Sequence, residues 1–108
     1  SSIQGALSYD ECGWAVDLNA NGTIIAIGSP ALHENARSRI GSVRVFERAD
    51  DWQQVGNTIQ GQSGVDEAFG SSLTLSSDGS TLVIGDYLSD DTTEPDVNKT
   101  DSGAARVF

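Results

Sequence analysis

The order of apolar and polar residues predicts two β-hairpins of the same design. Leu73 and Leu75 alternate with serine and threonine, which is the period of two expected of a strand. The pair Asp78-Gly79, which favours tight hairpin turns, separates this run from a second apolar run. Residues 12–28 follow the same plan around Asn21-Gly22. We therefore expect two hairpins that share one architecture.

The hairpins belong to a longer internal repeat. Gly22 recurs as Gly79 after 57 residues. The motif Gly-Ser-Val-Arg-Val-Phe at 41–46 recurs, 62 residues later, as Gly-Ala-Ala-Arg-Val-Phe at 103–108. The added residues lie in the connection before this last strand, where repeat proteins usually accept insertions. Nearly the whole chain is thus two copies of one unit.

Each unit is expected to consist of four short strands. In the first unit, the run Ile24-Ile25-Ala26-Ile27 is apolar on both faces, so it must be covered on both sides. No helical periodicity of useful length occurs, and this pattern at this repeat length is typical of a β-propeller blade. The expected strands of the first unit are 13–19, 23–28, 43–47 and 52–60.

The predicted fold is therefore all-β, with two four-stranded antiparallel propeller blades that form part of a larger ring or assembly. Residues 1–7 are expected to end a preceding outer strand, 8–62 to form the first repeat, and 63–108 to form the second, which lacks its outer strand. Two units cannot cover their own apolar faces, and the chain contains no Met. We expect a processed or excised segment that needs partners, either further blades of the same protein or another protein subunit.

The charge excludes several kinds of partner. The 108 residues have a formal net charge of -10, so polyanions such as nucleic acid and anionic membrane surfaces are disfavoured. No run is long and apolar enough for membrane insertion, and no signal peptide is visible. The single cysteine, Cys12, has no internal disulfide partner and is expected to be a small buried apolar side chain.

At two places the sequence resembles a known family of repeats. Two pairs of motifs resemble FG-GAP repeats. One pair is Phe69-Gly70 followed by Gly85-Asp86-Tyr87, and the other is Gly13 followed by Gly28-Ser29-Pro30. These are the propeller blades of integrin α subunits and of many extracellular microbial and algal proteins. The resemblance implies blades of a larger ring that contact other proteins in an extracellular or lumenal setting. Cys12 replaces the Phe of the motif in the first copy, and Asp86-Tyr87 replaces Ala-Pro in the second.

Residues 17–22 suggest a metal site. Asp17, Asn19 and Asn21 alternate with small or apolar residues and precede Gly22, as in the calcium loop of some FG-GAP blades. Calcium takes six to eight oxygen ligands, and residues 23–28 contain no acid that could complete the set. The alternative is that these polar residues alternate along a strand and close a tight turn. Calcium is the one cofactor that the sequence suggests.

Other candidate sites are weaker. The acidic stretch 89–102 could bind a cation, or it could be a solvated loop. Two glycosylation sequons occur, at Asn98 and at Asn21. The lone His33 has no nucleophile and acid at catalytic spacing, so no catalytic residue is predicted.

We therefore expect a non-catalytic binding or scaffolding module that mediates protein–protein or adhesion contacts. The alternatives are a calcium-stabilised adhesion module and a fragment of a carbohydrate-active propeller enzyme.

Overall fold

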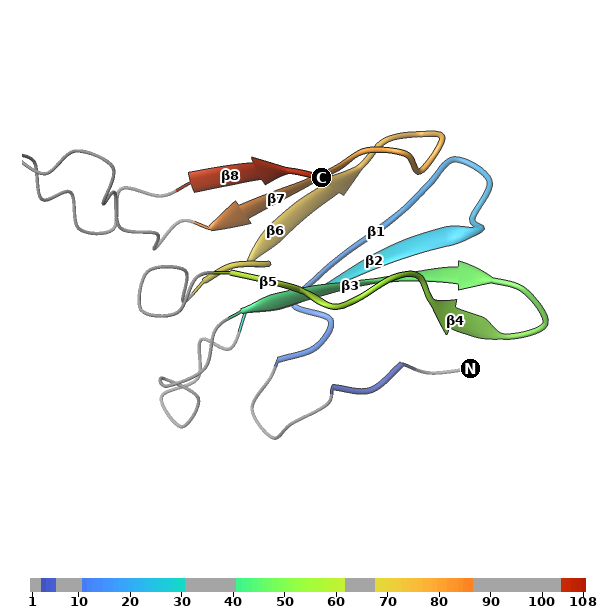
Figure 1. The fold of residues 1–108 in the computed structure, drawn as a ribbon, viewed down its shortest axis with the longest axis horizontal. Coiled ribbons are helices and arrows are strands. Elements are labelled where there is room, and N and C mark those ends of the chain that lie inside the picture. Colours follow the sequence, from blue (N-terminus) through green and yellow to red (C-terminus); the bar gives the residue numbers. More distant parts are fainter. Residues whose placement is uncertain (1–2, 6–10, 31–40, 62–67, 87–103) are drawn as a thin grey trace, which may run out of the picture.

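The described part of the chain consists of strands and turns (Figure 1). A computed structural model of the chain describes residues 3–5, 11–30, 41–61, 68–86 and 104–108. Within these ranges every strand pairing is antiparallel and no helix occurs, which confirms the all-β expectation. It follows that no membrane-spanning helix is found among these residues. The expected connections at 31–40 and 89–102, with His33 and Asn98, lie outside the described residues.

The first sheet contains five strands in the order β1-β2-β3-β4, with β5 paired to β3 beside β4. The fourth strand was expected to run unbroken over 52–60, but it is divided into two short strands. Gly56 interrupts it with a positive φ of 68°, and the N–H of Val55 donates to Val45 O at 2.7 Å just before the break. The strands are β1 (Ala15–Leu18), β2 (Ile24–Ser29), β3 (Ser42–Arg48), β4 (Trp52–Gln54) and β5 (Ile59–Gln60).

The second sheet contains β6 (Ser72–Leu75), β7 (Leu82–Asp86) and β8 (Ala104–Val107), in that order. Its register repeats that of the first sheet. Gly28 lies opposite Ala15 and Val43, and Gly85 lies opposite Ser72 and Ala105. The longer connection before β8 therefore leaves the pairing of the third strand unchanged.

The internal repeat extends to individual turns. Gly13 and Gly70 have φ values of 91° and 90°, a region that glycine adopts at little steric cost. Their N–H groups donate to Gly28 O and Gly85 O, both at 3.2 Å. Gly13 and Gly70 thus have the same backbone conformation in the two halves of the described chain, although the predicted unit boundaries at 8, 62 and 63 remain predictions.

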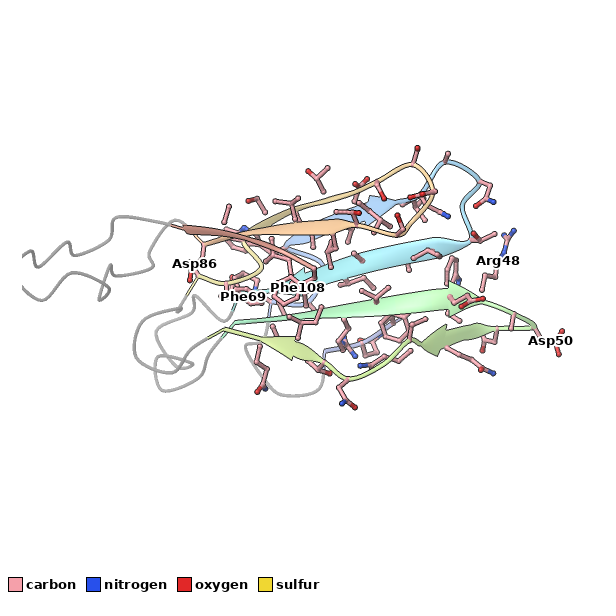
Figure 2. All side chains as sticks on the ribbon, turned by 45° about the horizontal axis from the view of Figure 1, so that its top comes forward. Arg48, Asp50, Phe69, Asp86 and Phe108 are labelled. Atoms are coloured by element: carbon pink, nitrogen blue, oxygen red, sulfur yellow. The ribbon has the colours of Figure 1, made fainter. Side chains whose placement is uncertain are left out.

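The two sheets enclose a common core. In the described chain, β6 is the strand of the second sheet that lies against β1 and β2 (Figure 1). Phe69, which precedes β6, is fully buried, and its ring meets that of Phe108 edge to face at 6.4 Å between centroids (Figure 2). The remaining buried members of the core cluster are Ala26, Val43, Leu75, Leu82 and Ile84.

Candidate functional site

The first sheet has two faces with different surroundings. Because successive strand residues point to opposite faces, Ile24, Ala26 and Val43 share the face that contributes to the common core, which we call the inner face. The opposite face carries Val16 and Leu18 of β1 with Ile25 and Ile27 of β2, and we call these four residues the open face. The apolar run of β2 therefore supplies side chains to both faces, as its sequence predicted.

The open face is apolar, and its β1 residues are uncovered, whereas Ile27 of β2 is only 5% exposed. Val16 is 58% exposed and Leu18 is 51% exposed. Two hollows lie over this face, of about 280 and 270 Å³. Both are lined by Val16 and Ile25, and Trp52 of β4 lines the larger one. Exposed apolar residues that adjoin one another in this way are a mark of interaction surfaces.

Residues 3–5 cover one end of this face. The guanidinium of Arg44 donates to Gln4 O at 2.8 Å, and its central carbon lies 5.4 Å from the centroid of the Phe46 ring. Ile3 lines the larger hollow. The contact of Arg44 with residues 3–5 was not predicted from the sequence. The recurrence of Arg-Val-Phe in both halves of the chain is the signal that could have indicated it.

Cys12 differs from its expected environment. It was expected to be buried and apolar, but it is partly buried and lines the larger hollow. Its sulfur accepts a hydrogen bond from the Arg44 guanidinium at 3.2 Å. The position corresponds to Phe69, 57 residues later, which is fully buried between the sheets. Cys12 is more exposed because, among the described residues, no second sheet covers it.

The same comparison applies to the whole open face. Its residues correspond, 57 positions later, to a set that faces the first sheet: Leu73, Leu75, Leu82 and Ile84. Leu75 is 7% exposed, whereas its counterpart Leu18 is 51% exposed. The two sheets therefore present equivalent apolar faces, of which the second is covered and the first is open at its β1 residues, while Ile27, like its counterpart Ile84, is buried.

The contact between the sheets depends on glycine. Gly70 needs its positive φ of 90°, and this turn directs its carbonyl oxygen at Gly28. A Cβ on Gly28 would overlap that oxygen, and a Cβ on Gly41 would overlap Phe69 O. Close backbone approach is thus the physical reason for glycine at positions 28 and 41.

The proposed calcium ligands all accept hydrogen bonds from the protein. Asp17 accepts from the N–H groups of Leu18 and Leu75, at 2.9 and 2.7 Å. Asn19 Oδ1 accepts from the N–H groups of Thr23 and Ile24, both at 2.9 Å.

Asn21 Oδ1, the third proposed ligand, accepts from the Thr23 hydroxyl at 2.6 Å. The turn thus satisfies its own backbone donors with these side chains. No group of three His, Cys, Asp or Glu residues that could hold a metal occurs in the described ranges. Calcium at Asp17, Asn19 and Asn21 stays a prediction.

The sequon at Asn21 lies on an exposed turn, where its amide oxygen bonds to Thr23 of the same sequon. Its glycosylation, like that of Asn98, stays a prediction. Comparisons of the chain with protein-family models, with curated proteins and with solved structures found no match.

Proposed function

We propose that the chain is a non-catalytic binding or scaffolding module, built of propeller-blade repeats like those of FG-GAP proteins, that contacts other proteins in an extracellular or lumenal setting. The observation that carries this proposal is the open face. Leu75 is buried in the second sheet, whereas its counterpart Leu18 and the neighbouring Val16 are exposed in the first. An interaction surface accounts for this difference.

The resemblance to FG-GAP repeats supports a propeller-blade architecture for this module. Phe69-Gly70 occupies the turn at which the sheets meet, and Gly28 provides the room that this turn needs. A propeller is built by repeating such sheets around a central channel, so the packing of one repeated sheet on the next supports this architecture. Phe69-Gly70 and Gly28 belong to the motifs by which the sequence resembles FG-GAP repeats.

The proposal can be tested on a panel of extracellular protein ectodomains and glycans. We expect the chain to bind ectodomains, and Leu18→Asp to abolish binding because it places a charge at the centre of the contact. Asn57→Asp is the matched control, since it adds the same charge in the exposed loop between β4 and β5. Binding that Leu18→Asp leaves intact, or turnover of a glycan, would contradict the proposal.

A further inference from the structure

We propose that the open face binds a second copy of this chain, through the outer face of that copy's second sheet. The outer face is the side of the second sheet turned away from the core, and it carries Thr74, Val83, Gly85 and Ala105. The contact would join copies head to tail. It deepens the proposed function, on which it rests, by naming one partner for the open face.

The chain already contains such a contact once, between its own two sheets. Within one molecule, Leu75 and Ile84 of the second sheet belong to the same buried cluster as Ala26 of the first. Leu18 and Ile27 are their counterparts on the open face, and Val83 is the counterpart of Ala26. A second copy placed with its Val83 over the exposed Leu18 would repeat the internal packing with the equivalent residues, while Ile27, which is only 5% exposed, would form the floor of the contact.

The glycine positions of the internal contact also occur twice in the chain. The internal contact needs a turn at Gly70 and a strand glycine at Gly28. Both have glycine counterparts in the chain, Gly13 and Gly85. Gly13 has a φ of 91° and nothing within 4 Å of a Cβ placed on it. Gly85 lies on the outer face of β7 under the side chain of Ser72, so the Ser72 hydroxyl has to rotate away before the turn of a second copy can approach Gly85. The backbone features of the internal contact are therefore present a second time.

The outer face is suited to this role by its size and polarity. Ala105 and Thr74 are exposed, and Val83, which lies opposite Thr74 in the register, is partly exposed. None of the four outer-face residues named above is charged. The small uncharged residues of the outer face would lie opposite the larger aliphatic residues of the open face. The inner contact is built in the same way, since Ala26 and Val43 share one buried cluster with Leu75 and Leu82.

The arrangement predicts a heterologous interface. The two contacting surfaces differ, so each copy retains one free surface of each kind after pairing. The net charge of -10 opposes association of identical copies, and salt screens this repulsion while it leaves the apolar contact in place. Self-association should therefore strengthen as salt is added.

Sedimentation equilibrium of the full chain, with two variants that each damage one surface, tests the proposal. Leu18→Asp damages the open face, and Ala105→Asp damages the outer face at an exposed position. Each variant alone should associate more than about tenfold more weakly than the wild type, because a carboxylate would be buried without a partner. Asn57→Asp adds the same charge away from both faces and should associate as the wild type does.

An equimolar mixture of the two variants gives the decisive result. The intact outer face of Leu18→Asp can bind the intact open face of Ala105→Asp, so the mixture should form a dimer that grows no further. Circular dichroism confirms that each variant keeps its fold.

A wild-type chain that stays monomeric at high protein and salt concentration overturns the proposal. So does an Ala105→Asp variant that still self-associates, since the open faces would then bind each other. Either result leaves the proposed function standing if ectodomains still bind in a manner that depends on Leu18.

Discussion

The carboxylate of Asp17 on β1 accepts a hydrogen bond from the backbone N–H of Leu75 on β6, at 2.7 Å. Both strands are at the edges of their sheets, where N–H groups lack a partner from a neighbouring strand. The Ala20 N–H donates to Ser77 O at 2.9 Å across the same boundary. The two sheets are thus joined by polar contacts at their edges as well as by the apolar core.

Asp17→Ala should destabilise the chain by about 1–3 kcal/mol, because it leaves the Leu75 N–H without its charged acceptor. Asp17→Asn should cost less, since the amide keeps one oxygen acceptor. Urea denaturation of both variants measures the difference. Equal stability of the alanine variant and the wild type would show that the contact contributes nothing.

Gly28→Ala should be strongly destabilising, by about 3 kcal/mol or more, because the new methyl group would overlap the carbonyl oxygen of Gly70. Gly22→Ala is the matched control. It has a positive φ of 72° but nothing within 4 Å of its Cβ position, so it should cost only about 1–2 kcal/mol. Thermal denaturation ranks the two. A larger loss at Gly22 would contradict the close approach of the sheets at Gly28.

Phe69→Ala should cost about 3–5 kcal/mol, because the fully buried ring packs between the sheets and against Phe108. Phe69→Leu keeps most of the apolar volume and should retain much of the stability. Chemical denaturation followed by tryptophan fluorescence distinguishes these variants. If both unfold at the wild-type midpoint, the core between the sheets is not formed in solution.

Hydrogen bonds from the Ser80 backbone N–H, the Ser80 hydroxyl and the Ser76 hydroxyl lower the pKa of Asp78 from 3.8 to about 2. A carboxylate with a lowered pKa in the folded state stabilises the fold above the ordinary pKa, and this contribution is lost as the pH falls from about 4 towards 2. Asp78→Asn should therefore reduce the acid sensitivity of the turn. NMR titration of the Asp78 carboxyl carbon measures the pKa, and a midpoint near 4 would contradict the hydrogen-bonded turn.

We expect no calcium binding at Asp17. Titration of calcium should therefore give the same heats for the wild type and for Asp17→Ala. The oxygens of Asp17, Asn19 and Asn21 already accept hydrogen bonds within the protein, and calcium would have to displace these donors. Isothermal calorimetry at neutral pH makes the measurement. A saturable signal that is lost in Asp17→Ala would instead support the calcium-stabilised adhesion module.

Much of the fold could be predicted because the local signals agree with one another. The turns at Asn21-Gly22 and Asp78-Gly79, the alternation along β6, and the doubly apolar run of β2 all indicated antiparallel strands. The break in the fourth strand was missed. The pair Gly56-Asn57 is its sequence signal, but a glycine within a strand pattern is also compatible with an unbroken strand.

The candidate site could be predicted only in part. The repeat showed that apolar faces would need covering, but alternation alone does not say which face the second sheet covers. Asp17 was assigned to a metal loop because its spacing fits one, whereas its contact with Leu75 joins residues 58 positions apart. Such a contact depends on how the sheets pack, and no local pattern encodes it.

The inner and open faces of the first sheet are unlike, and this has an evolutionary consequence. Duplication of such a unit adds one more buried contact, while the two terminal surfaces of the stack stay the same in kind. Each added unit therefore raises the buried fraction without a new interface having to arise by mutation. What limits the growth of such an array is the angle between successive sheets, because that angle decides at which number of units the first surface meets the last.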